Sequence, residues 1–189
     1  EAEAGDIQVT VKEVKAAPVS RTHAFSSDII RQLVSDIEQE PFQPSYRRVS
    51  FGAPVKGWRQ RLDAYFWPRP AVGYRQTCDA LAPLLVTARQ LADSIEKWTP
   101  ELQAQAVEFA DQVFAWGGVV QRTAYDWRDV HAVFASAIRG KRQDDARMNS
   151  GWTKVAAFAS SHLEPEHNLV IWDSRVAHSL TQRLDAILH

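Results

Sequence analysis

Apolar residues recur at helical spacing along most of the chain. A stripe of isoleucine, leucine and valine from Ile29 to Ile37 is typical of an amphipathic helix, and similar spacing returns in later segments. Strict apolar–polar alternation occurs at Ile7, Val9 and Val11, which predicts a half-buried strand over residues 6–14. The helices expected from the apolar spacing cover residues 26–40, 58–67, 74–97, 100–116 and 126–139.

Local signals set the ends of several of these helices. Thr99 is a good N-cap before Pro100, and Asp126 is followed three residues later by Asp129, which favours a capped start. Gly140 is expected to stop the helix that Asp126 starts. Pro83 is expected to kink or restart the helix that contains it. We therefore predict a mainly α protein with a small N-terminal β element.

Residues 41–58 interrupt the helical pattern with proline and glycine and are expected to form a loop. This loop carries Tyr46, Arg47, Arg48 and Lys56. Two interpretations stay open, a solvated loop or an arm that touches phosphate.

Trp116 is followed by Gly117 and Gly118, which break the helix before them. Two glycines together favour a helix stop, but they also permit a close backbone approach beside a ligand or a DNA strand. The sequence leaves both interpretations open.

The last third of the chain has a distinct order of elements. A polar, glycine-containing hairpin over 148–151 is followed by a short apolar helix with Lys154 in its first turn. After a loop with Pro165, the apolar run 169–172 is expected to be strand-like, and Asp173 caps a final helix.

Bulk composition narrows the class of protein. A chain of 189 residues suits one domain, expected over 5–189, with Glu1 to Ala4 set aside from fold reasoning. A single cysteine, Cys78, excludes an internal disulfide framework and indicates a reducing cytoplasm. The histidines have no common zinc spacing, and no apolar run reaches 18 residues. We expect a monomer in the cytoplasm that uses no metal, cofactor or membrane.

Positive charge is local rather than global. The net charge is −1, which does not indicate a nucleic-acid-binding protein by itself. Between Arg139 and Lys154, however, five basic residues stand against two acidic ones. Four of the five basic residues precede the hairpin and Lys154 follows it. Two interpretations stay open, a solvated loop or contact with phosphate beside the hairpin.

Two short motifs resemble a known family. The first motif, Trp152-Thr-Lys-Val-Ala, follows the hairpin and contains Lys154. The second motif is Trp172-Asp-Ser-Arg, and its aspartate, Asp173, lies 19 positions after Lys154. This arrangement resembles the core of the helix-hairpin-helix DNA glycosylase superfamily, and within it the lysine-bearing 8-oxoguanine DNA glycosylase branch. The resemblance covers residues 148–180 and implies a helix-hairpin-helix glycosylase-like helical domain.

The resemblance implies a mechanism for two of these residues. Lys154 would attack the sugar C1′ of a flipped nucleotide and form a Schiff base, with strand cleavage (AP lyase activity) as a possible second step. Asp173 would stabilise the cationic sugar, in addition to capping its helix. The Lys154 amine is then expected within roughly 8 Å of the Asp173 carboxylate.

The resemblance also implies binding residues on double-stranded DNA that contains a damaged or modified base. The hairpin departs from the usual Leu-Pro-Gly-x-Gly pattern and keeps one glycine in it, and Phe158 replaces a pocket cysteine of the animal enzymes. Phe158 either stacks on the flipped base or belongs to the core stripe. The DNA-binding candidates are Asn149, Ser150, Gly151, Arg147 and Arg175, and the base-pocket candidates are Phe158 and Trp116.

Three classes of function follow from the sequence. The first is a DNA glycosylase that acts in base excision repair or in defence against phage DNA with modified bases. The second is a non-catalytic DNA-binding module with an eroded hairpin. The third is a helical protein-interaction domain whose motif match is accidental. Convergence of Lys154 and Asp173 on one cleft, beside a basic face, would separate the first two classes from the third.

Overall fold

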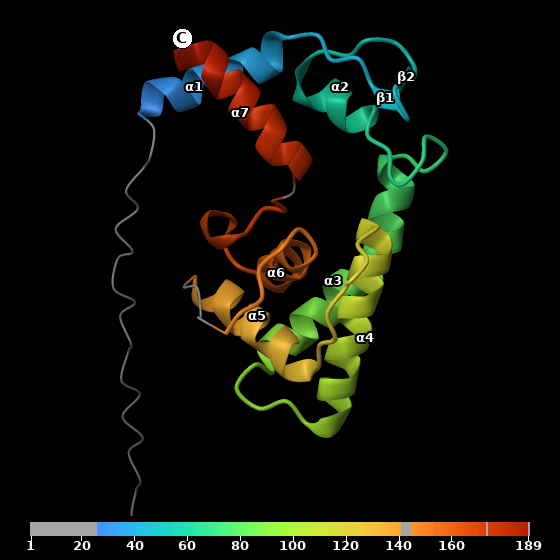
Figure 1. The fold of residues 1–189 in the computed structure, drawn as a ribbon, viewed down its shortest axis with the longest axis vertical. Coiled ribbons are helices and arrows are strands. Elements are labelled where there is room, and N and C mark those ends of the chain that lie inside the picture. Colours follow the sequence, from blue (N-terminus) through green and yellow to red (C-terminus); the bar gives the residue numbers. More distant parts are fainter. Residues whose placement is uncertain (1–25, 141–144, 173, 189) are drawn as a thin grey trace, which may run out of the picture.

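The computed structural model describes residues 26–140, 145–172 and 174–188, and its fold is mainly helical (Figure 1). The predicted strand over 6–14 lies outside these residues. The α-helices are α1 (Ser27–Gln39), α2 (Gly57–Asp63), α3 (Tyr74–Asp93), α4 (Pro100–Gly117), α5 (Trp127–Arg139), α6 (Trp152–Ser160) and α7 (Ser174–Leu188). They are joined by a hairpin of β1 (Ser45–Tyr46) and β2 (Val49–Ser50) and by a 3-10 turn η1 (Pro165–His167).

Side chains cap the helices where the sequence predicts them. The Thr99 hydroxyl accepts from the Leu102 backbone N–H at the start of α4, and Asp126 and Asp129 form a complete capping box at the start of α5. Gly118 and Gly140 end these helices with φ of 64° and 61°, a left-handed conformation in which glycine avoids a steric penalty. The predicted starts and stops of α4 and α5 are therefore confirmed.

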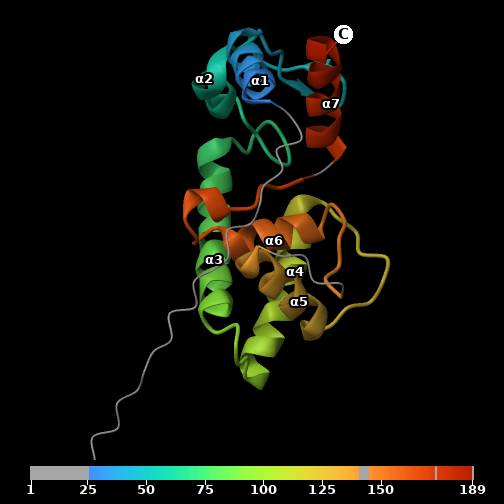
Figure 2. The same cartoon turned by 90° about the vertical axis from the view of Figure 1, so that its left-hand side faces the viewer.

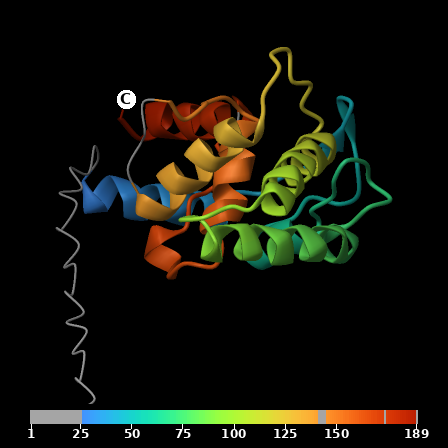
Figure 3. The ribbon, with the colours of Figure 1, turned by 90° about the horizontal axis from the view of Figure 1, so that it is seen from below.

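The hydrophobic core belongs to α3, α4, α5 and α6, which lie together in the lower part of Figure 1 (also Figure 3). Every buried hydrophobic residue of the described chain falls between Leu84 and Ala159. Phe109, Phe134 and Phe158 meet edge to face near the centre, at ring distances of 5.7 and 5.9 Å. The helix that carries Lys154 is thus held by contacts with α3, α4 and α5.

A second group of elements lies above this core, as Figure 2 shows, and consists of α1, α2, α7 and the β1–β2 hairpin. Helix α1 packs on α2 and α7. No residue of α1 is fully buried, and Ile30 and Val34 remain 43% and 48% exposed. These elements are therefore fixed by shallow contacts, among them an Arg183–Glu40 ion pair between α7 and the end of α1.

Three sequence predictions need correction. The run 169–172 is irregular backbone, because it has no partner strand to pair with in the described chain. Residues 41–58 are not only loop, since they contain the β1–β2 hairpin and the start of α2. Helix α3 continues through Pro83 without a restart and ends at Asp93, earlier than position 97.

The described residues contain neither a candidate membrane-spanning helix nor a candidate metal site. None of the helices there combines the length and the apolar character needed to cross a membrane. Within the same residues, no group of three or more histidine, cysteine or acidic side chains is arranged to hold a metal ion.

Truncating the centre of the core should destabilise the whole helical bundle. Phe109 is 1% exposed, so Phe109→Ala should lower the free energy of unfolding by about 3–5 kcal/mol. Val86→Ala is the control on α3, since Val86 is 70% exposed and its loss should change stability by about 0.5 kcal/mol or less. Urea unfolding followed by circular dichroism measures both, and equal losses would contradict the assigned core.

Candidate functional site

The hairpin before α6 is closed by one side chain. The Asn149 carboxamide oxygen accepts from the backbone N–H of Gly151 at 2.8 Å and of Trp152 at 3.1 Å. The Thr153 N–H donates to the Asn149 carbonyl at 2.9 Å. Asn149 therefore satisfies amide groups at the start of α6 that would otherwise lack an intrahelical partner.

Gly151 packs closely against the end of α4 and the residues that follow it. A Cβ added there would lie 2.6 Å from the Gln121 side-chain nitrogen and 3.0 Å from atoms of Phe114 and Val119. A larger residue at this position would therefore require these side chains to shift. The next residue, Trp152, is 1% exposed and packs edge to face against Phe114 and Tyr125, at 5.0 and 5.2 Å.

Lys154 lies on the buried side of α6. Only 6% of the residue is exposed, and its amine Nζ donates to the Ser150 carbonyl at 2.9 Å. Its aliphatic stem runs against Gly117 at the end of α4, where an added Cβ would lie 2.7 Å from the lysine Cδ. Buried lysines are rare in proteins, so this placement is more unusual than that of a lysine on the solvent-exposed face of a helix.

The helix-stop interpretation of the Gly117-Gly118 pair is confirmed, whereas a close approach to a ligand or a DNA strand stays a prediction. Gly118 is the left-handed stop of α4. Gly117 is buried and leaves room for the side chain of Lys154, which is a close approach of the kind that glycine permits. The approaching group is a lysine of the same chain.

The segment before α7 reaches the start of α6. The Thr153 hydroxyl donates to the Trp172 carbonyl at 2.9 Å, so the residue before Lys154 touches the residue before Asp173. Helix α7 then begins at Ser174. Asp173 itself lies outside the described residues, as does the side chain of Arg175, so the expected distance from Lys154 to Asp173 stays a prediction.

The two base-pocket candidates are in contact with each other. Phe158 is 5% exposed and meets Trp116 edge to face at 6.0 Å, with Phe109 on its other side. Phe158 is thus part of the core stripe in this structure. The indole nitrogen of Trp116 is buried and has no hydrogen-bond partner among the described residues, so it is a donor that an incoming acceptor could satisfy.

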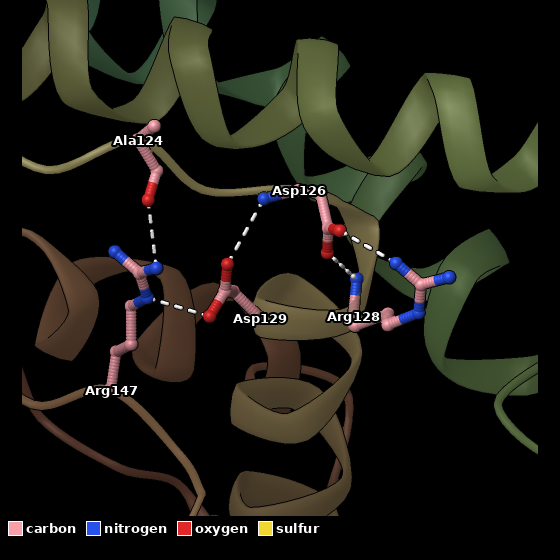
Figure 4. Close-up of polar contacts among 5 residues, drawn as sticks. All are labelled: Ala124, Asp126, Arg128, Asp129 and Arg147. Atoms are coloured by element: carbon pink, nitrogen blue, oxygen red, sulfur yellow. Dashed lines mark hydrogen bonds and ion pairs between the residues drawn. The ribbon is translucent and has the colours of Figure 1, made fainter.

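Arg147 points back into the protein, as Figure 4 shows. Its Nε lies 2.6 Å from the Asp129 carboxylate, and its Nη2 donates to the Ala124 carbonyl at 2.8 Å. The same carboxylate accepts from the Asp126 N–H in the capping box of α5. Arg147 therefore connects the hairpin to the start of α5. Contact of its remaining guanidinium N–H groups with phosphate stays a prediction.

A groove runs beside the hairpin between residues 119–123 and 147–152, with a volume of about 480 Å³. Asn149 and Ser150 line one wall, and Arg122 lines the other and is exposed. Sequence reasoning missed Arg122, because nothing in its local context places it opposite the hairpin.

Two ionisable groups near the hairpin are perturbed by their surroundings. The backbone N–H of Arg128 donates to the Asp126 carboxylate and holds the pKa of that carboxyl below its usual value. Burial raises the pKa of the Tyr125 phenol, and its hydrogen bond to Asp111 adds to this effect. Both groups form hydrogen bonds at the end of the segment that joins α4 to α5.

No family model, no curated protein and no solved structure matches the chain. Assignment of a function therefore depends on the motif residues and on the geometry just described.

The Arg147–Asp129 pair should contribute measurably to stability because it is mostly shielded from solvent. Arg147→Ala should lower the free energy of unfolding by about 1–3 kcal/mol. A double-mutant cycle with Asp129→Ala should give a coupling energy of about 1 kcal/mol, measured by urea unfolding. The exposed Arg89–Asp93 pair on α3 is the matched control, with coupling below about 0.5 kcal/mol. Zero coupling at Arg147 would show that the pair is not formed in solution.

Proposed function

We propose that the chain is a DNA glycosylase of the helix-hairpin-helix type, which flips a damaged or modified base out of double-stranded DNA and excises it. The observation that carries the proposal is the placement of Lys154. It is a buried lysine in the first turn of the helix that follows the hairpin, and its neighbour Thr153 bonds to the backbone just before Asp173. The contact brings together the two motifs that carry the resemblance, so both observations support one site.

The proposed chemistry uses the amine of Lys154 as the nucleophile. The nitrogen forms a bond to the sugar C1′ while the bond from C1′ to the base breaks, and the base leaves with that electron pair. Loss of the amine proton and opening of the sugar ring then give a Schiff base, from which β-elimination would cleave the strand. The carboxylate of Asp173 would stabilise the positive charge on the sugar as the base departs.

Access to the amine requires local movement. With 6% of Lys154 exposed, a nucleotide can reach Nζ only after the surrounding residues move, among them Ser150, whose carbonyl accepts from the amine. Ser150 belongs to the hairpin that would hold the DNA backbone. Binding of DNA at the hairpin and release of the amine are therefore coupled in this proposal.

The hairpin can contact phosphate in one of two ways. Asn149 already accepts from the N–H groups of Gly151 and Trp152, so a phosphate must displace the carboxamide to use them. The alternative is contact at the groove rim, where Arg122 faces Asn149 and Ser150. We expect phosphate to bind at the rim first, because binding there leaves the hydrogen bonds of Asn149 to Gly151 and Trp152 intact.

The proposal is tested by borohydride trapping on a panel of duplexes that contain modified bases. The wild-type protein should form a covalent adduct with its substrate, and Lys154→Gln should abolish it, because an amide cannot form a Schiff base. Folding should be nearly intact, since the glutamine amide can still donate to Ser150. Asp173→Asn should slow base release by orders of magnitude and keep the helix cap. An Asp173→Asn protein with full excision activity would refute this mechanism.

The position of the lysine stem can be tested separately. Gly117→Ala should displace the Lys154 side chain, because the new Cβ would lie 2.7 Å from Cδ and 3.0 Å from Cε. We expect adduct formation to slow by about tenfold or more. Thermal stability should change little, since a lysine stem is flexible and alanine is the better helix former. Unchanged trapping by a folded Gly117→Ala protein would show that this packing does not position the amine.

A second candidate function is a DNA-binding module without excision activity. The closed hairpin and the internal bond of the Lys154 amine favour it, since both groups are engaged in the absence of DNA. This candidate predicts binding to unmodified and modified duplexes alike and no adduct with any base on the panel.

A further inference from the structure

The segment 41–75 is the most basic and the most aromatic part of the chain. It contains seven lysine and arginine residues against one acid, Asp63, although the chain as a whole has a net charge of −1. All but one of the seven are exposed, and Phe51 and Trp58 are also 45% and 53% exposed. The basic residues are Arg47, Arg48, Lys56, Arg59, Arg61, Arg69 and Arg75. We call this segment, which includes β1, β2 and α2, the basic lobe.

The tip of the basic lobe has an unusual turn. Tyr46 pairs with Val49, so Arg47 and Arg48 form a two-residue hairpin turn, with φ of 52° and 68°. Such turns require positive φ at both central residues, and Asn-Gly is the usual choice because these residues tolerate it. Two arginines are a poor choice for folding here. The stability of the turn therefore does not explain the two charges at this exposed tip.

The hairpin is held firmly enough to present these charges. The ring of Phe66 packs edge to face against Tyr46 at 6.1 Å and Phe51 at 5.5 Å. The Phe51 N–H donates to the Pro44 carbonyl at 2.8 Å. The tip is therefore backed by an aromatic cluster and does not hang as a free loop.

The basic lobe is joined directly to the candidate site. The indole N–H of Trp67 donates to the Trp116 carbonyl at 2.6 Å, and its ring lies 3.8 Å from where a Gly118 side chain would begin. The intervening residue, Gly117, is the one that packs against Lys154. In Figure 1 the lobe lies at the upper end of α3, on the same side as the C-terminal end of α4.

We propose that the basic lobe is a second DNA-binding surface, in which Arg47 and Arg48 hold backbone phosphates at a distance from the nucleotide beside Lys154. Charge complementarity supports this partner, since a dense cluster of exposed guanidinium groups in an otherwise acidic chain suits a polyanion. The inference rests on the DNA-binding part of the proposed function and does not depend on excision.

The turn allows a variant that removes both charges while favouring the fold. Arg47→Asn with Arg48→Gly supplies the preferred residues of this turn, so thermal stability should stay the same or rise. Binding to a short unmodified duplex, measured by fluorescence anisotropy over a salt series, should weaken by about tenfold or more at low salt. The slope of log K against log salt should fall by about two, as expected for two lost phosphate contacts.

The matched control is Arg31→Gln with Arg89→Gln, which removes two exposed arginines from α1 and α3 outside the lobe. This control should keep the wild-type slope within about half a unit. An unchanged slope in the turn variant, or an equal fall in the control, would overturn the proposal. It would also be overturned if the wild-type protein bound vesicles of anionic lipid through these arginines and did not bind the duplex.

The experiment separates failure of the lobe from failure of the glycosylase proposal. A trapped adduct together with a turn variant of wild-type affinity would refute the lobe and leave excision standing. Loss of affinity in the turn variant, with no adduct on any substrate, would support the lobe and the DNA-binding module while refuting excision.

Discussion

The candidate site depends on the close packing of the start of α6 against the end of α4. Two glycines make this contact possible, Gly151 against Phe114 and Val119, and Gly117 against the stem of Lys154. A Cβ at either position would lie 3.0 Å or less from these side chains, so they would have to shift to make room for it. Because Trp152 is buried in the same contact, the lysine is fixed by the core itself and not by surface loops.

Polar contacts then orient the site around this packing. Asn149 closes the hairpin, Thr153 attaches the segment that leads into α7, and Arg147 ties the hairpin to the capped start of α5. The Asn149 contact is local to the hairpin, whereas the Thr153 and Arg147 contacts join segments that are 18 or more positions apart in the chain. The chemistry proposed for Lys154 is thus supported by a rigid frame, while the residues that cover its amine, among them Ser150, must move to admit a nucleotide.

The two halves of the molecule differ in how they are stabilised. The bundle of α3 to α6 contains every buried hydrophobic residue of the described chain. The elements around α1 and the basic lobe are stabilised instead by shallow contacts between partly exposed side chains, aromatic rings among them. Shallow packing of this kind suits the proposed binding surface, because it leaves the arginines in contact with water and free to meet phosphate. The Trp67–Trp116 hydrogen bond is where the two halves meet beside the candidate site.

The sequence by itself determined the helices whose ends are capped locally. Thr99, Asp126, Gly118 and Gly140 act within one turn of their own position, so hydrogen bonding and glycine conformation fix those boundaries without the rest of the fold. It also singled out Lys154 through the motif resemblance.

Only the tertiary structure decided the burial of Lys154, the inward turn of Arg147 and the partnership of Gly117 with the lysine. It also left residues 169–172 irregular, where a run of four apolar residues had favoured a strand. These outcomes depend on contacts between residues far apart in the chain, and neither spacing nor propensity records which distant neighbour a side chain will meet.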